Sequence, residues 1–220
     1  MWRAVATKEL REVSGIAAVA LALGLALVVY EIQARPYSRV PWAYGQALVP
    51  FVNDDFVVYF SFIAAAFSIG LGFRQSLGEE FRGTYPFLLH RPMSRRAVIL
   101  TKLLTGGAVY LACSAVPILV YGVWAATPGT HASPFFWSMT ELSVSLQLTM
   151  LTLYLGAFLS GIRPARWLGT RILPLAGSVV PAVLVFIVQW FSQIGGFVLL
   201  AAALGPLAAT ICHVAGTRDY

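Results

Sequence analysis

Six long apolar runs determine most of what this chain can fold into. They cover approximately residues 14–32, 56–73, 97–126, 136–161, 172–190 and 195–214. Each run approaches or exceeds the roughly 20 apolar residues that a helix needs to cross a bilayer. Hydrophobic residues make up 59% of the 220 residues and charged residues 11%, whereas about a quarter of a soluble domain is charged. The sequence therefore predicts an integral membrane protein with six spans.

The continuity of the runs favours helices over membrane-spanning strands. Membrane strands alternate in hydrophobicity over roughly 10 residues, and an unclosed sheet would leave backbone polar groups facing lipid. The predicted fold class is all-α, with six transmembrane helices. Because no internal repeat or linker separates the runs, we expect residues 1–220 to form one transmembrane domain. The runs contain Pro117, Pro174, Pro181 and Pro206. Such prolines either kink the helices into joints for alternating access or give them fixed bends.

Lys and Arg collect in alternate loops, which predicts the orientation of the chain. One set of loops contains Arg3, Lys8, Arg11, Arg74, Arg82, Arg91, Arg95, Arg96, Lys102, Arg163, Arg166, Arg171 and Arg218, and the other set contains Arg35 and Arg39. Since short cytoplasmic loops are enriched in basic residues, both termini are predicted to be cytoplasmic. The net charge of +6 then reflects topology, because a nucleic-acid-binding protein would gather its basic residues on one soluble face.

The first 13 residues have the pattern of an amphipathic helix. Trp2, Ala6, Leu10 and Val13 recur at helical spacing, and charged residues such as Glu9 fall on other faces. A helix of this kind lies at the membrane interface. The same residues could also form a cytosolic extension of the first span, and the sequence leaves both interpretations open.

Residues 78–96, GEEFRGTYPFLLHRPMSRR, form a segment that we call the charged segment. It mixes acidic, basic, aromatic and aliphatic residues with glycine and proline, which interrupt regular structure. This composition predicts a short helix against the membrane and then a turn into the third span, with Ser94 as a candidate N-cap. A positive-inside anchor would explain the arginines. It would not require the paired carboxylates of Glu79 and Glu80, or the glycine followed by threonine.

Nine residues in and just after the charged segment share a recognisable spacing. They are Glu80, Gly83, Thr84, Leu88, Leu89, Pro92, Ser94, Arg95 and Lys102. This series resembles the cytoplasmic signature of the ABC-2 type transporter permease family, roughly E-x-x-G-T-x-x-x-L-L-x-x-P-x-S-R followed by a lysine. Residues 8–10, Lys-Glu-Leu, are similar to an element that family members carry before their six spans. The resemblance therefore extends over the whole chain.

The resemblance implies that the chain is the membrane subunit of an ATP-binding-cassette exporter in the cytoplasmic (inner) membrane. It also implies that the charged segment forms a cytoplasmic coupling helix between the second and third spans, which docks on an ATPase. The residues given this coupling role are Glu79, Glu80, Arg82, Gly83, Thr84, Leu88, Leu89, Pro92, Ser94 and Arg95. The expected partners are two copies of an ABC ATPase subunit and a second permease, as a homodimer or as a heterodimer with a similar chain.

The sequence predicts no catalytic, cofactor-binding or metal site in this chain. It lacks the G-x-x-x-x-G-K-[ST] phosphate loop, so ATP and Mg²⁺ are expected in the partner ATPase. Its cysteines and histidines do not have metal-ligand spacings. A membrane enzyme is less favoured, because neither a G-x-S-G motif nor a run of aspartates is present. An ATPase-driven scaffold, which would do conformational work on an envelope partner without moving a solute, is an alternative function.

Small and polar residues form a stripe along one face of the fourth apolar run. Ser138, Glu141, Ser145, Thr149, Thr152, Gly156 and Ser160 recur every three or four residues. Polar atoms are costly against lipid, so we expect this stripe to face protein or water. Glu141, Ser145, Thr149 and Thr152 are the candidate translocation path, and packing against neighbouring helices is the alternative. Glu141 lies either inside the fourth span or in the outer interface.

Overall fold

A computed structural model describes residues 2–34, 49–52, 54–82, 94–131, 134–163 and 170–217. The helices in these ranges are α1 (Trp2–Ala34), α2 (Phe56–Arg82), α4 (Arg95–Ala126), α5 (Glu141–Thr149), α6 (Leu151–Ile162), α7 (Leu173–Phe191) and α8 (Gln193–Thr217), and the short 3-10 helix η2 (Trp137–Thr140) precedes α5. These ranges contain no strand. The all-α prediction is therefore confirmed for the described residues.

The lengths of the helices agree with the predicted spans. The helices α1, α2, α4 and α8, and the run from Trp137 to Ile162, are long and apolar enough to cross a membrane. The remaining apolar helix, α7, has 19 residues. At 1.5 Å per residue it reaches about 28 Å, which nearly matches a hydrocarbon core of about 30 Å. The described residues therefore hold five to six helices that could span a membrane.

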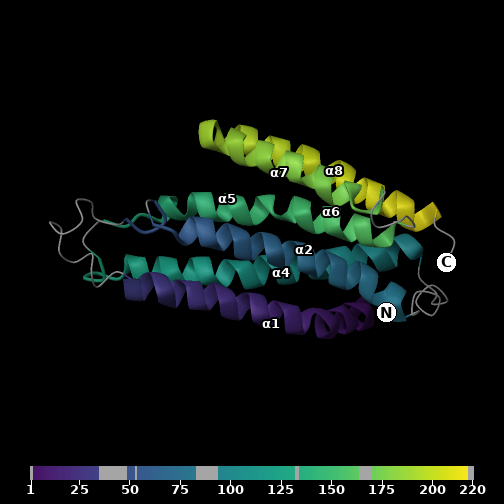
Figure 1. The fold of residues 1–220 in the computed structure, drawn as a ribbon, viewed down its shortest axis with the longest axis horizontal. Helices are drawn as coiled ribbons and strands as arrows, with labels where there is room; N and C mark the ends of the chain where they lie inside the picture. The colour runs from purple at the N-terminus through teal and green to yellow at the C-terminus, as the bar shows by residue number, and fades with distance from the viewer. Residues whose placement is uncertain are drawn as a thin grey trace.

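The helices run along one common direction and pack in layers. In Figure 1, α1 lies along α4, α2 lies along α6, and α7 and α8 form a pair beside α6. The helix α1 begins and α8 ends at the same end of the bundle, which we call the terminal end, and the opposite end is the distal end. The axes of α7 and α8 diverge from α5 toward the distal end.

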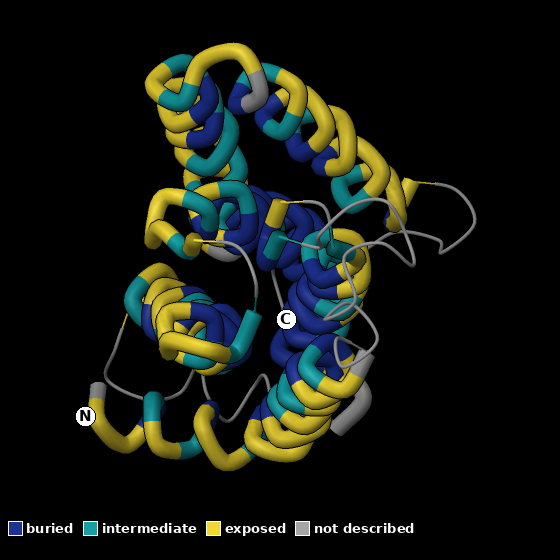
Figure 2. Tube along the Cα trace, turned by 90° about the vertical axis from the view of Figure 1, so that its left-hand side faces the viewer, coloured by how far each residue is buried: buried dark blue, intermediate teal, exposed yellow. Residues whose placement is uncertain are grey.

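Each helix buries the side that faces its neighbours. Figure 2 shows buried residues where helices meet and exposed residues on the outward faces. Leu104, Val120 and Phe191 are among the large apolar side chains on these outward faces. An extensive apolar surface of this kind suits contact with lipid. In the interior, Gly72 of α2 allows α6 to approach closely, because a Cβ at this position would lie 2.6 Å from the Tyr154 carbonyl oxygen.

Aromatic side chains pack together at the distal end. The ring centroids of Phe51 and Tyr121 are 4.7 Å apart, and those of Phe56 and Tyr121 are also 4.7 Å apart. Asp54 Oδ2 accepts hydrogen bonds from the Tyr121 hydroxyl at 2.7 Å and from the Phe51 N–H at 3.0 Å. These contacts join the segment before α2 to the end of α4.

The N-terminal residues continue directly into the first span. Because α1 is unbroken, these residues form the extension that the sequence left open, and not a separate interfacial helix. The buried face of this extension also differs from the predicted one. Leu10, assigned to the apolar face, is 47% exposed, and Glu9, assigned to another face, is buried together with Val5. Val13 is buried, as predicted. Glu9 can be buried because side chains from other helices contact its carboxylate, as described below.

The second span also continues further than the sequence predicted. The helix α2 extends to Arg82, so the backbone of the first five residues of the charged segment is helical. Residues 83–93, which carry most of the predicted coupling helix, lie outside the described residues. The next helix begins at Arg95, and Ser94 Oγ accepts a hydrogen bond from the Ala97 N–H at 3.3 Å. Ser94 is therefore the N-cap of α4, as predicted.

The helix of the fourth span is interrupted, but at a residue that is not a proline. The helices α4, α7 and α8 each continue as one helix through Pro117, Pro181 and Pro206, respectively. Pro174 lies in the first turn of α7, where its missing N–H costs no helical hydrogen bond. The fourth span instead changes from α5 to α6 at Met150.

Candidate functional site

A buried ion pair joins α1 to α4 near the terminal end. Lys102 Nζ lies 2.8 Å from Glu9 Oε1, and both side chains are 0% exposed. Burial removes both charges from water, which costs several kcal/mol for each ion. Such a pair is stable only where further hydrogen bonds satisfy the remaining polar atoms.

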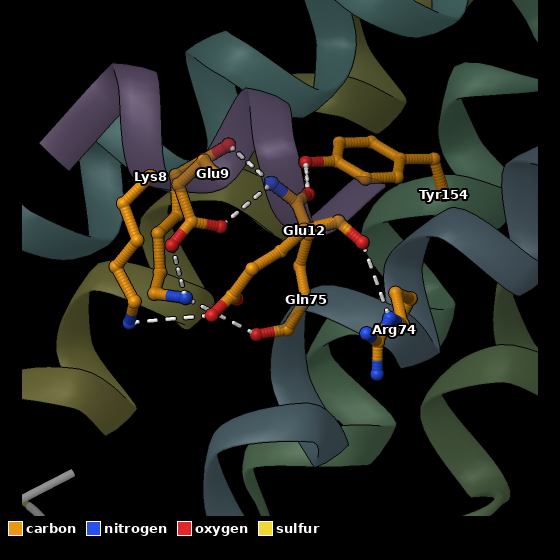
Figure 3. A network of polar contacts seen from close by, with 7 residues as sticks. Lys8, Glu9, Glu12, Arg74, Gln75 and Tyr154 are labelled. Carbon is orange, nitrogen blue, oxygen red and sulfur yellow. Dashed lines mark hydrogen bonds and ion pairs between the residues drawn. The ribbon is translucent and has the colours of Figure 1, made fainter. Parts of the chain in front are cut away.

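Gln75 of α2 and Tyr154 of α6 provide those further hydrogen bonds. Gln75 Nε2 donates to Glu9 Oε2 at 3.2 Å and to the Lys102 carbonyl oxygen at 3.1 Å. The Tyr154 hydroxyl donates to Gln75 Oε1 at 2.7 Å, and Lys102 Nζ donates to the Gln75 carbonyl oxygen at 3.3 Å. Figure 3 shows Glu9, Gln75 and Tyr154 pointing toward one another. We call Glu9, Gln75, Lys102 and Tyr154 the four-helix polar network.

The network connects the two helices that flank the charged segment. Gln75 lies about two turns before α2 ends at Arg82, and Lys102 lies about two turns after α4 begins at Arg95. The network also connects these helices to α1 through Glu9 and to α6 through Tyr154. Both flanks of the charged segment are therefore fastened to the bundle core by buried polar contacts.

Two other basic residues near the terminal end contact backbone carbonyls. Arg74 Nε donates to the Glu12 carbonyl oxygen at 3.3 Å, beside the partly exposed Lys8–Glu12 pair (Figure 3). Arg171 donates through Nε to the Ser160 carbonyl oxygen at 3.2 Å and through Nη2 to the Gly161 carbonyl oxygen at 2.8 Å. Because a helix C-terminus presents unpaired carbonyls and partial negative charge, Arg171 caps α6.

The structure describes part of the predicted coupling set. Glu79, Glu80 and Arg82 belong to the helical backbone of α2. Ser94 caps α4, and the exposed Arg95 is its first residue. Gly83, Thr84, Leu88, Leu89 and Pro92 lie outside the described residues. The structure therefore describes how the two flanks of the charged segment are anchored, through Gln75 of α2 and Lys102 of α4.

The polar stripe of the fourth span faces the protein interior over most of its length. Ser145, Thr149 and Thr152 are buried, whereas Glu141 is exposed as the first residue of α5. The Thr149 hydroxyl donates to the Ser145 carbonyl oxygen at 2.8 Å, and the Thr152 hydroxyl donates to the Thr149 carbonyl oxygen at 2.8 Å. Gly156 packs directly against Ser178 of α7. Packing thus accounts for part of the stripe.

Sequence reasoning missed Gln75 and Tyr154 and placed Glu9 on a polar face. A usable signal existed for Gln75, because a polar side chain close to an apolar run is expected to face protein. Tyr154 carries no comparable signal, since a tyrosine toward the end of a span is expected at the membrane–water interface without any further role. In the part of the chain that the structure describes, no group of three His, Cys, Asp or Glu side chains is placed to hold a metal ion.

The fold defines a class of protein, a multi-pass helical membrane protein with a buried polar network at its terminal end. The family model for ABC-2 family transporter proteins matches residues 5–166, about three quarters of the chain and all four network residues. The chain therefore belongs to the ABC-2 transporter family, whose members are membrane permease subunits of ABC transporters. A comparison with curated proteins found no match, and a comparison with solved structures found none either.

Proposed function

We propose that this permease subunit couples ATP hydrolysis, carried out by a separate ATPase subunit, to export of a substrate through contacts made by the charged segment. The observation that carries the proposal is the four-helix polar network. It fastens the two flanks of the charged segment to α1 and α6 through buried contacts of 2.7 to 3.3 Å.

The network suits coupling because it resists separation of the helices that it joins. Separating α1 from α4 would leave the charges of the buried ion pair uncompensated, which is costly. The helices that the network joins therefore move together more readily than apart. Movement of the charged segment would therefore displace α2 and α4 with α1 and α6 as one packed unit, in the manner of rigid-body switching. In this proposal ATP closes two ATPase copies against two permease copies, and the spans then exchange inward-open and outward-open states.

In the same proposal the terminal end faces the cytosol from the cytoplasmic membrane. The Lys and Arg residues of the described ranges lie toward the helix ends that meet at the terminal end. They are Arg3, Lys8 and Arg11 in the first three turns of α1, Arg74 and Arg82 in the last three turns of α2, Arg95, Arg96 and Lys102 in the first turns of α4, and Arg163 and Arg171 between α6 and α7. ATP and Mg²⁺ belong to the partner ATPase, and residues 1–220 act as one domain. The proposed translocation path follows Ser145, Thr149 and Thr152 along the fourth span, with Glu141 at its distal mouth.

The test is co-purification of the tagged chain from its native membrane, with partners identified by mass spectrometry and ATP hydrolysis measured. We expect an ATP-binding-cassette protein to accompany the wild-type chain, and Glu80→Lys to lose it. Glu141→Lys is the matched control for recovery of the partner alone, because it makes the same charge reversal at an exposed position of the distal end. Equal recovery with Glu80→Lys would refute the coupling role. ATP hydrolysis without solute flux in vesicles would instead favour the scaffold function.

A further inference from the structure

The regular helical hydrogen bonding of the fourth span is interrupted at the change from α5 to α6. The Met150 N–H donates to the Leu146 carbonyl oxygen at 3.0 Å, and the Tyr154 N–H donates to the Met150 carbonyl oxygen at 3.1 Å. Between these two bonds, the Leu151 N–H does not make the helical bond to the Gln147 carbonyl, so the helix is interrupted at Met150. An unpaired carbonyl within a membrane span is costly.

A side chain from α4 takes the place of the missing bond. The buried Tyr110 hydroxyl donates to the Gln147 carbonyl oxygen at 2.9 Å. The side chain of Gln147 in turn donates through Nε2 to the Leu111 carbonyl oxygen at 2.7 Å and to Ser114 Oγ at 2.9 Å. Three hydrogen bonds, which we call the α4–α5 contact, therefore hold the last turn of α5 against the middle of α4.

A groove lies beside the same interruption, where α2, the fourth span and α7 meet. It encloses about 380 Å³, and its lining includes Leu146, Met150 and Leu153 of the fourth span and Val179, Val183 and Phe186 of α7. The hydroxyls in the lining belong to Ser61 and Thr149, and both donate to carbonyls of their own helices. Since α7 diverges from α5 toward the distal end, the direction of α5 affects the width of this groove (Figure 1).

We propose that Tyr110 and Gln147 are positioning residues that hold the fourth span bent at Met150 and thereby keep the groove between α5 and α7 open. The Gln147 carbonyl has an alternative donor, the Leu151 N–H, which would continue α5 into α6 as one straight helix. Straightening would exchange the Tyr110 hydroxyl for the Leu151 N–H at the Gln147 carbonyl and would re-form the neighbouring backbone bonds across Met150. The two arrangements therefore form a two-state element of the kind that switching proteins use. Gln147 and Tyr110 thus control which state is occupied.

The expected displacement is large enough to measure. The nine residues of α5 extend about 14 Å at 1.5 Å per residue. A change of about 20° in direction, the lower limit for a sharp kink, moves the distal end of α5 by about 5 Å. The α4–α5 contact pulls α5 toward α4, so its loss lets α5 move toward α7. The role of this movement in transport rests on the proposed function, whereas the bend itself does not.

The test uses the isolated full-length chain in lipid nanodiscs, with spin labels on α5 and α7 at Val144→Cys and Val183→Cys. Both positions are exposed, and the native Cys113 and Cys212 are replaced by alanine. Tyr110→Phe removes the hydroxyl and keeps the ring. We expect the label-to-label distance to shorten by several Å, and amide hydrogen exchange of the peptide containing Leu151 to slow as its N–H gains the Gln147 carbonyl.

Two further variants make the result specific. Gln147→Met removes the two side-chain hydrogen bonds and should shift the distance in the same direction. Tyr121→Phe is the matched control, because it removes another buried hydroxyl from the same helix, whose partner is Asp54 at the distal end. It should leave the exchange at Leu151 unchanged. An unchanged distance and unchanged exchange in Tyr110→Phe would overturn the positioning role. This outcome is independent of ATPase recovery, so it leaves the proposed function standing.

Discussion

Replacement of Lys102 by methionine should be among the most destabilising single changes in the protein. Met keeps most of the side-chain volume but leaves Glu9 buried without its cation, at a site where both side chains are 0% exposed. Breaking a buried pair by removing one partner costs about 3–5 kcal/mol. With about 2–4 °C of unfolding temperature for each kcal/mol in a chain of this size, the expected decrease is about 6–20 °C.

The double variant Glu9→Leu/Lys102→Met separates the charge effect from a packing effect. Replacing both members of a buried pair by apolar residues is often neutral or stabilising, so this variant should unfold within about 4 °C of wild type. Lys8→Met is the matched control, because Lys8 lies 3.7 Å from Glu12 with its side chain 31% exposed. A partly exposed pair of this kind contributes about 1 kcal/mol or less.

The assay is thermal unfolding of the detergent-solubilised chain at one fixed scan rate, since membrane proteins often unfold irreversibly. Tryptophan fluorescence reports the transition for all four proteins under the same conditions. If Lys102→Met unfolded within about 2 °C of wild type, or if the double variant lost as much stability as Lys102→Met alone, the ion pair would not carry the stability assigned to it.

Two further predictions concern contacts near the terminal end. Gly106→Ala should lower the unfolding temperature, because its Cβ would collide with the Gln75 amide and the Tyr154 hydroxyl. Gly107→Ala is the control: a Cβ there meets nothing within 4 Å, so the change should be neutral or stabilising by up to about 1 kcal/mol. Equal unfolding temperatures of the two variants would contradict the close packing at Gly106. Arg171→Gln should cost about 2 kcal/mol or more by removing two charge-assisted hydrogen bonds to the end of α6, and should speed proteolysis between α6 and α7. Arg171→Lys should recover only part of this loss, because lysine lacks the planar guanidinium group that donates to two carbonyls at once. Full recovery of stability would contradict this two-point contact.

The extents of the helices were largely predictable because they depend on local properties. Long apolar runs are too costly to expose and too long for strands, so their number and approximate ends follow from composition. The N-cap Ser94 was also predictable, since capping involves residues three positions apart. The spacing of residues 80–102 likewise indicated the family that the comparison shows. The continuation of α2 to Arg82 was missed, because glutamates and arginine at the end of an apolar run resemble the start of a loop.

The interruption of the fourth span at Met150 was not predicted from the sequence. Prolines are the local signal for a bend, yet α4, α7 and α8 continue through theirs, and the interruption falls at Met150. We attribute it to the hydrogen bond that the Gln147 carbonyl accepts from Tyr110, which lies 37 residues earlier in the chain. A stretch of sequence limited to the fourth span does not include Tyr110, so it cannot reveal this donor.

Composition and periodicity by themselves determined that this chain is helical and membrane-spanning, because both properties follow from hydrophobicity. The spacing of residues 80–102 carries a resemblance to the ABC-2 transporter family, and the family model shows the membership. Tertiary structure alone decided which polar groups are buried together. Glu9 became a core residue only because folding brings Lys102 and Gln75 to it from other helices, at separations of 93 and 66 residues. A buried charge is tolerable only when its partner is present, and no local pattern records where a distant partner will lie.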